Sequence, residues 1–202
     1  THQFNNGCGR ADLFPITIIY YLFHNEIMQW QNAAGEASLK LENLGNLNGF
    51  FEGEAHSALH DTYASFKMAR LFRGKQPKTW EYLLGRFNKD ADRDEITKLR
   101  EEGALKNKPV VAYAVDSRYG YAKNFTGLVL DIGESLAYKN QTLWLRLDSE
   151  TLQETTPDNV YETSMVIRKR LGDLPLVLPP YPRYGAKIDA ERTRIEQENL
   201  QW

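Results

Sequence analysis

Two residues with complementary chemistry stand close together in the first third of the chain. His56 is followed, five positions later, by Asp61. A neutral imidazole accepts protons near pH 7, and a carboxylate is a ligand that hard divalent cations prefer. Because five helical positions turn the chain by about 500°, the two side chains meet only if His56 lies on the turn that leads into the helix carrying Asp61. The pair therefore predicts a site for metal-dependent hydrolysis, with His56 as the general base and Asp61 as a metal ligand.

Two other interpretations of these residues stay open. On residue type alone, His56 is a structural or surface histidine and Asp61 is a solvated helix residue. His56 and His60 also stand at the i, i+4 spacing by which a helix presents two imidazoles to zinc. The glutamate that zinc hydrolases carry directly after the first histidine is absent, because Ser57 occupies that position. An exposed His60 is therefore favoured over a zinc ligand.

Two helices should position this pair. The segment 39–47 has leucines at amphipathic spacing and stops at Gly49, where a left-handed residue can end a helix. A second helical pattern begins at Ala55 and carries one apolar stripe that we expect to be buried. This stripe consists of Leu59, Tyr63, Phe66, Ala69, Leu71 and Phe72.

The stretch 39–72 resembles the last acidic motif of the DEDDh 3′→5′ exonucleases, in which a histidine precedes an aspartate by five positions. The resemblance narrows to the exonuclease I family, the bacterial single-strand DNA exonucleases. Other stretches are similar to that family in the same order along the chain. They are Arg10–Leu13 with the apolar run to Trp30, Arg73–Pro77 with Tyr82-Leu83 and Asn88-Lys89, and Arg146–Leu152.

The resemblance implies an α+β chain of two domains. Residues 1–76 are expected to form the helical C-terminal portion of a ribonuclease H-like exonuclease domain. Residues 77–202 are expected to form an SH3-like antiparallel β-barrel domain with flanking helices, which clamps DNA. The partners implied by the resemblance are single-stranded DNA and a single-strand DNA-binding protein, and the implied process is DNA repair.

The activity that the resemblance implies is 3′→5′ hydrolysis of single-stranded DNA at a site with two Mg²⁺ ions. That site uses four carboxylates in the family, and only the last of them is matched here, by Asp61. One carboxylate cannot hold two divalent ions, because each ion needs several oxygen ligands. We therefore expect the chain to be inactive alone and to need a missing N-terminal half or a separate polypeptide. The alternative is a non-catalytic module, derived from this family, that binds single-stranded nucleic acid or another protein.

Local patterns predict the remaining elements. Residues 12–23 combine a capping aspartate and an early proline with strand-prone residues, and the resemblance favours a helix there. Pro77 should end the preceding helix, and 157–171 fits a helix with a strand left open around 163–166. The other expected helices are 79–87, 95–102 with Asp94 as its cap, and 188–202; the expected strands are 109–115, 125–132, 142–147 and 174–178.

Aromatic and basic residues alternate in a polar connection of the second half. Aromatic faces stack on unpaired bases, while Lys and Arg side chains hold the phosphate backbone. The opposite interpretation is that these aromatic residues fill the core of a small barrel. A second basic cluster, Arg168-Lys169-Arg170, is more typical of a solvated face. The DNA surface predicted from this pattern consists of Arg118, Tyr119, Tyr121 and Lys123.

Composition limits the other possibilities. With 202 residues and 42% hydrophobic content, the chain is long enough to bury a core. Its net charge of -2 gives no global signature of nucleic-acid binding, so any DNA surface has to be a local patch. A single cysteine, Cys8, excludes an internal disulfide framework and predicts a cytoplasmic protein. The apolar run 16–23 is too short to span a membrane.

Overall fold

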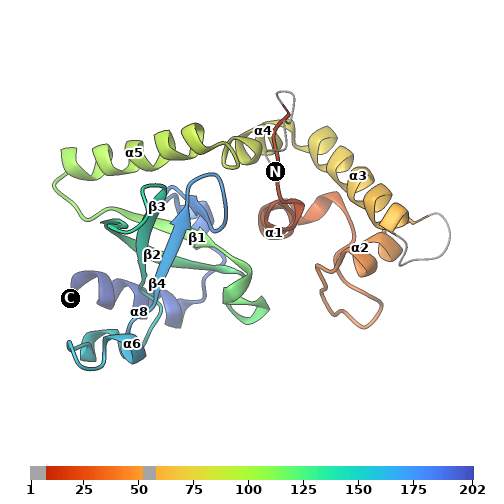
Figure 1. Ribbon diagram of the computed structural model, residues 1–202. Coiled ribbons are helices and arrows are strands. Elements are labelled where there is room, and N and C mark those ends of the chain that lie inside the picture. The colour runs from red at the N-terminus through yellow and green to blue at the C-terminus, as the bar shows by residue number, and fades with distance from the viewer. Residues whose placement is uncertain (1–7, 52–57) are drawn as a thin grey trace. The chain divides into compact units, whose positions relative to one another are not determined.

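The computed structural model describes residues 8–51 and 58–202 (Figure 1). The chain divides into two compact units, Thr1–Gly85 and Arg86–Trp202. This division follows α4 (Pro77–Gly85), so it lies one helix after the domain boundary that the sequence predicts at residue 76. The assignment of an exonuclease part and a DNA-clamping part to the two halves stays a prediction.

The described part of the first unit is built from helices. Its first helix covers the strand-prone run and confirms the predicted helix; the side chain of Asp12 caps it by accepting the N–H of Phe14 at 2.9 Å. Residues 15–20 of this helix are all buried, so packing outweighs their local strand preference. The second helix ends just before Gly49, whose φ of 66° is left-handed, as expected. The helices of this unit are α1 (Leu13–Phe23), η1 (Asn25–Ile27), α2 (Leu41–Leu47), α3 (Ala58–Lys75) and α4.

The core of the first unit includes a contact between α1 and α3. The ring of Tyr20 stacks on the ring of Phe72 with centroids 4.1 Å apart, and the Tyr20 hydroxyl donates to the Phe72 carbonyl oxygen at 3.2 Å. Burial raises the pKa of Tyr20 to about 12. The buried side chains of α3 are Ala64, Met68 and Phe72, which repeat every four positions. A single stripe of α3 therefore provides its buried face.

The apolar stripe predicted to be the buried face of α3 is largely exposed. Phe72 is buried as predicted, whereas Leu59, Tyr63 and Phe66 are 75%, 42% and 55% exposed. The helix carries two apolar faces, and the face with the small side chain of Ala64 is the one that packs inward. The prediction followed the larger side chains and so selected the outward face.

The second unit begins with a long helix, α5 (Lys89–Leu105). The prediction of a helix over 95–102 capped by Asp94 placed its start too late. The side chain of Asn88 accepts the N–H groups of Asp90 and Ala91, so the helix begins immediately after Asn88.

An antiparallel sheet of five strands forms the framework of this unit, in the order β4-β3-β2-β1-β5. Its inner face buries Trp144, Val129 and Ala112, and Ile96 of α5 joins the same cluster. Figure 1 shows α5 and α8 on different sides of the sheet. The sheet and its flanking helices confirm the α+β class and the antiparallel architecture expected of an SH3-like domain. The strands are β1 (Val111–Val115), β2 (Thr126–Glu134), β3 (Gln141–Arg146), β4 (Val166–Arg170) and β5 (Leu176–Leu178).

Short helical segments connect the strands. The segment 157–171, expected to be helical, forms a short helix only over 160–163. A strand follows over 166–170, so the strand left open at 163–166 begins at Val166. No helix in 8–51 or 58–202 is long and apolar enough to cross a membrane. The connecting and terminal segments are η2 (Ser117–Tyr119), η3 (Tyr121–Lys123), η4 (Leu152–Glu154), α6 (Val160–Thr163), α7 (Pro182–Gly185) and α8 (Ala190–Gln201).

A cluster of buried charges joins α5 to the sheet. One oxygen of Asp92 lies 2.6 Å from Lys169 Nζ and the other lies 2.8 Å from Arg86 Nη2, and none of the three side chains is more than 2% exposed. Arg86 Nη2 also donates to the Val177 carbonyl oxygen at 2.9 Å. Burial lowers the pKa of Lys169, and the charge of Asp92 opposes that shift.

The prediction that 168–170 forms a solvated basic face was wrong for its central residue. Arg168 and Arg170 are exposed, but Lys169 is buried because alternate strand residues face opposite sides of the sheet. Gly172 closes the cluster by donating its N–H to Asp92 at 2.8 Å. It has a left-handed φ of 74°, and a Cβ there would lie 3.0 Å from the side chain of Lys89, so glycine is required at this turn.

We expect Asp92→Asn to lower the free energy of unfolding by about 3 to 5 kcal/mol, because it leaves buried Lys169 and Arg86 without a counter-charge. Urea unfolding at pH 7, followed by circular dichroism, measures the loss. The matched control is Lys98→Met, which removes an exposed ion pair with Glu95 and should leave the free energy of unfolding close to wild type. Equal losses for the two variants would contradict the role given to Asp92.

Candidate nucleic-acid interface

The predicted hydrolytic pair is only partly described. His56 lies outside the described residues, and Asp61 is exposed in the first turn of α3. Within 8–51 and 58–202, no group of three or more His, Cys, Asp or Glu side chains could hold a metal ion. The described residues therefore do not by themselves form a two-ion centre, and the zinc alternative also depends on His56. The roles of His56 and Asp61 stay predictions.

The predicted DNA surface falls on η2 and η3, the turns between β1 and β2. Asp116 caps η2: its Oδ1 accepts the Arg118 N–H at 2.8 Å. The guanidinium of Arg118 folds back on the same carboxylate, with Nε 2.9 Å from Oδ1 and Nη2 2.7 Å from Oδ2. Burial by itself raises the pKa of Asp116, but the hydrogen bonds from Arg118 outweigh it and hold that pKa below its usual value. Arg118 is thus held in one orientation while its side chain stays 62% exposed.

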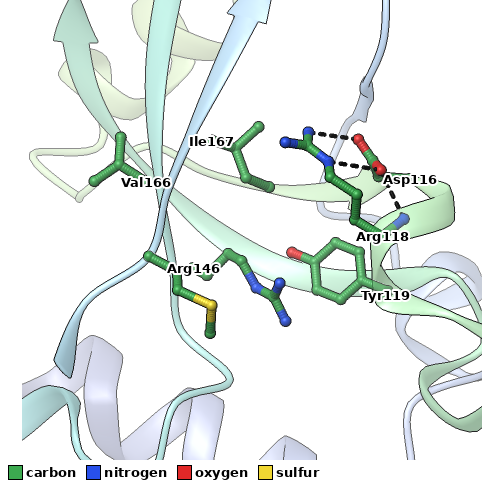
Figure 2. Close-up of a pocket in the computed structure, with 7 residues that line it drawn as sticks. Asp116, Arg118, Tyr119, Arg146, Val166 and Ile167 are labelled. Carbon is green, nitrogen blue, oxygen red and sulfur yellow. Dashed lines mark hydrogen bonds and ion pairs between the residues drawn. The ribbon is translucent and has the colours of Figure 1, made fainter. Parts of the chain in front are cut away.

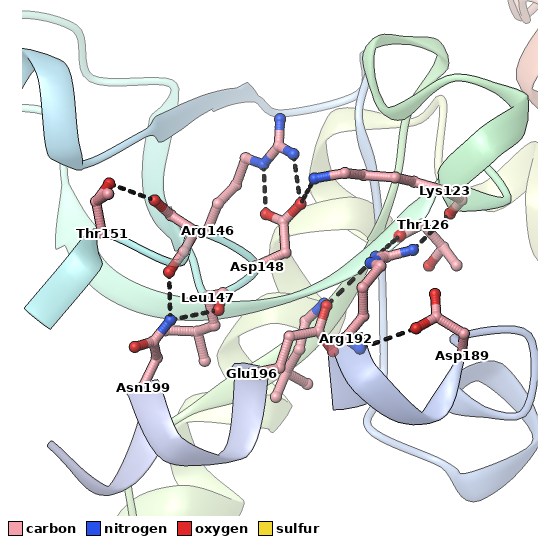
Figure 3. Close-up of polar contacts among 12 residues, drawn as sticks. Lys123, Thr126, Arg146, Leu147, Asp148, Thr151, Asp189, Arg192, Glu196 and Asn199 are labelled. Atoms are coloured by element: carbon pink, nitrogen blue, oxygen red, sulfur yellow. Dashed lines mark hydrogen bonds and ion pairs between the residues drawn. The ribbon is translucent and has the colours of Figure 1, made fainter. Parts of the chain in front are cut away.

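A second buried carboxylate, Asp148, holds two cations. Arg146 donates to it through Nε at 2.8 Å and Nη2 at 2.7 Å, and Lys123 Nζ lies 2.6 Å from its Oδ2 (Figure 3). The Asp148 side chain has no exposed surface. Burial alone raises the pKa of Asp148, yet the hydrogen bonds from Arg146 and Lys123 lower it to about 2. Asp148 is therefore a permanent anion at neutral pH.

Tyr119 connects these two groups. Its side chain is only 5% exposed, and the Arg146 guanidinium lies over its ring, 4.1 Å from the centroid. The ring packs against Gly127, where a Cβ would come within 2.6 Å of it. Tyr119 thus supports Arg146, and its ring is not open in the way that the predicted base stacking requires.

Tyr121 keeps the exposure that stacking needs. Its side chain is 46% exposed, and its ring meets Phe125 edge to face at 4.7 Å. Of the two predicted aromatic residues, Tyr121 is therefore the better placed to meet a base.

A pocket of about 260 Å³ opens beside these groups (Figure 2). One side of it is polar, with the Asp116–Arg118 pair and Arg146, and the other side is apolar and comes from the start of β4. Figure 2 shows Tyr119 between the two arginines, across the pocket from Val166. The lining residues are Asp116, Arg118, Tyr119, Arg146, Met165, Val166 and Ile167.

Helix α8 fixes the backbone beneath these groups. Arg192 donates to the carbonyl oxygens of Lys123 and Thr126, and Asn199 Nδ2 donates to that of Leu147 at 2.8 Å (Figure 3). The Glu196 carboxylate accepts the Leu128 N–H at 3.0 Å. One helix thereby holds both the turn after β1 and the end of β3. The backbone that carries Lys123 and Asp148 is therefore fixed in position.

The side chains form one row of alternating charge, which we call the charge row: Arg118, Asp116, Arg146, Asp148 and Lys123. The link between its halves is electrostatic, since Arg146 also acts to lower the pKa of Asp116. The row has three cations and two carboxylates and holds no nucleophile or metal cluster. Its chemistry is the donation of N–H groups to an anion such as a phosphate.

The DNA surface predicted from the sequence includes the two ends of the charge row, Arg118 and Lys123. Arg146 was among the alternating basic residues but was not chosen, and Asp116 and Asp148 were not considered. The signal was present in the opposite charges two positions apart, Asp116 with Arg118 and Arg146 with Asp148. Such pairs are common on exposed loops, and only burial distinguishes these two.

Comparison with known proteins gives relatives in sequence and in structure. No family model matches the chain. It is 33% identical over 105 residues to exodeoxyribonuclease I of Haemophilus influenzae, covering 52% of this chain and 21% of that protein. It is 28% identical over 168 residues to exodeoxyribonuclease I of Escherichia coli K12, covering 82% of this chain and 34% of that protein. The chain thus spans about a third or less of the length of these relatives.

Solved structures share the fold. A crystal structure of E. coli exonuclease I in complex with a dA16 oligonucleotide matches 95% of this chain and 43% of its own, with a TM-score of 0.72 and 20% identity. A structure of SSB and exonuclease I in complex with an inhibitor matches 98% and 44%, with a TM-score of 0.73 and 21% identity. At this level of identity the likeness establishes the fold.

We expect the stability lost in Asp148→Asn to depend on pH. The folded-state pKa of Asp148 is lowered to about 2, so the carboxylate stabilises the fold above its unfolded pKa of roughly 4 and loses this effect as pH falls toward 2. Urea unfolding should show a loss on the order of 2 kcal/mol at pH 7 and little difference from wild type near pH 2.

The control for this measurement is Asp90→Asn, because the Asp90 side chain is 83% exposed. Its free energy of unfolding should stay close to wild type at both pH values. A loss for Asp148→Asn that was the same at pH 7 and pH 2 would show that ionisation of Asp148 is not what stabilises the fold.

Proposed function

Since this chain is related to the exonuclease I family over most of its length, we propose that it is the DNA-holding part of a 3′→5′ exodeoxyribonuclease that acts on single-stranded DNA. The observation that carries the proposal is the charge row, in which two buried carboxylates hold three cations in fixed positions. The name of the curated relatives and the oligonucleotide bound to E. coli exonuclease I support the choice of DNA as the ligand.

In this proposal the phosphate backbone lies along the charge row. Lys123 and Arg118 contact phosphates directly, because their side chains are 37% and 62% exposed. Tyr121, at the adjacent turn, stacks on a base. Tyr119 acts from below, by supporting Arg146.

For the hydrolytic step we propose Asp61 as a ligand for Mg²⁺ and His56 as the general base, as the family resemblance implies. The described residues do not complete such a centre, so no step of the reaction is derived from them. The remaining carboxylates of a two-ion site have to come from residues beyond the described ones or from another polypeptide. We accordingly propose that the chain alone is inactive as a nuclease.

The second candidate is a non-catalytic module that binds single-stranded nucleic acid. The observation that favours it is the contrast between the two sites: the charge row is fully formed, whereas no metal cluster exists among the described residues. The two candidates share the DNA surface and differ only in catalysis.

The proposal also includes a protein partner and a cellular location. A single-strand DNA-binding protein is the proposed protein partner, supported by the structure of SSB with exonuclease I. A cytoplasmic location is proposed because the sequence has a single cysteine, Cys8.

We expect the chain to bind oligo-dT with an affinity that falls as salt rises, and Lys123→Gln to make that dependence shallower. Each phosphate contact on a single strand contributes about 0.7 to the slope of log K against log salt, so losing one should lower the slope by about 0.7. Fluorescence anisotropy with labelled dT at several salt concentrations measures it. The control is Lys98→Gln, because Lys98 of α5 is also an exposed lysine, with a side chain 65% exposed. The salt slope of this variant should match that of wild type.

We expect no shortening of a 5′-labelled oligonucleotide when it is incubated with the chain and Mg²⁺, because the described residues supply only one of the required carboxylates. A denaturing gel reads out the product ladder. His56→Ala is run beside wild type. A ladder formed by wild type and lost in His56→Ala would overturn the proposal that the chain is inactive alone and would favour the nuclease over the binding module.

A further inference from the structure

Two carboxylates lie within the charge row, where a surface that binds phosphate would be expected to avoid negative charge. Asp116 and Asp148 together cancel most of the charge of the three cations beside them. Both are buried, with side chains 5% and 0% exposed. On charge alone they should weaken the binding of DNA, because a carboxylate repels a phosphate.

Their geometry has the opposite effect, because it leaves outer donors of Arg118 and Lys123 available. A guanidinium has five N–H donors, and Asp116 uses only Nε and Nη2 of Arg118 through its side-chain contacts. Asp148 uses the same two nitrogens of Arg146 and one donor of Lys123. The donors that remain on Arg118 and Lys123 belong to partly exposed groups.

Fixing these cations in advance removes a cost of binding. Free Lys and Arg side chains sample many rotamers, and part of that entropy is lost when they are immobilised on a ligand. In the charge row that order is already imposed by carboxylates that cannot reach the solvent. The backbone beneath is fixed as well, by Arg192 and Asn199 of α8.

We propose that Asp116 and Asp148 are positioning residues for DNA: they hold Arg118, Arg146 and Lys123 so that the free N–H groups of the exposed cations, Arg118 and Lys123, meet phosphates. The inference rests on the proposed function. Positioning predicts that removing either carboxylate weakens DNA binding. Electrostatics alone predicts the reverse, that binding becomes tighter, so the two explanations can be told apart by experiment.

The test is the affinity and the salt slope of Asp148→Asn and Asp116→Asn for oligo-dT, measured by anisotropy on the full chain. Positioning predicts about tenfold weaker binding for Asp148→Asn, the loss expected when roughly two side chains must be ordered on binding. The salt slope should stay near wild type, because no cation has been removed. For Asp116→Asn a smaller loss is expected, because it orders one cation.

The matched control is Asp131→Asn. Asp131 is also a largely buried aspartate held by an arginine, with Arg100 Nε 2.6 Å from its Oδ2, but it faces α5 and not the charge row. Its replacement changes the net charge equally, so binding should be unchanged or slightly tighter. Circular dichroism of each variant at the assay temperature shows that it is folded, and Asp148→Glu, which keeps the charge, should recover part of the affinity.

The outcomes separate the inference from the proposed function. If wild type does not bind oligo-dT, the proposed function fails and the positioning role fails with it. If wild type binds, and folded Asp148→Asn and Asp116→Asn bind equally well or more tightly, only the positioning role is overturned. A loss of affinity with a markedly lower salt slope also overturns it, because that result means that phosphate contacts have been removed rather than misplaced.

Discussion

The second unit depends on the burial of one carboxylate, that of Asp92. A buried anion needs counter-charges and hydrogen bonds to offset its lost hydration, and Asp92 obtains them from Lys169, Arg86 and the Gly172 N–H. Lys169 belongs to β4, and Arg86 reaches the carbonyl oxygen of Val177 in β5, so the cluster touches both outer strands of the sheet. The curled sheet therefore has its two ends held against the same helix, α5.

The charge row uses the same chemistry for a different purpose. Asp148, like Asp92, is a carboxylate without exposed surface that is contacted by an arginine and a lysine. Around Asp92 the cations are buried as well, and the result is a fixed fold. Around Asp148 the lysine is partly open to solvent, and the result is a surface with oriented donors. The difference lies in the exposure of the lysine, which is 0% for Lys169 and 37% for Lys123.

Much of the fold was predictable because its signals are local. The cap of α1 at Asp12, the break at Pro77 and the strand periods after residue 108 all follow from short patterns. The buried face of α3 was not predictable in this way, because two apolar faces compete and only packing within the unit selects the one with Ala64. Lys169 was missed for a related reason: once 166–170 is known to be a strand, alternation places it beside buried Ile167. In the candidate interface, the exposed cations were visible in the sequence and the buried carboxylates that hold them were not.

Strand β4 lies at one end of the sheet order, and its exposed side chains include Arg168 and Arg170. An outer strand is a template on which a second molecule can continue the sheet, the first step toward fibrous association. If two copies aligned along β4, their arginines would be brought together and would repel. The pair that flanks Lys169 thus opposes growth of the sheet from one chain into the next, while Lys169 itself faces inward.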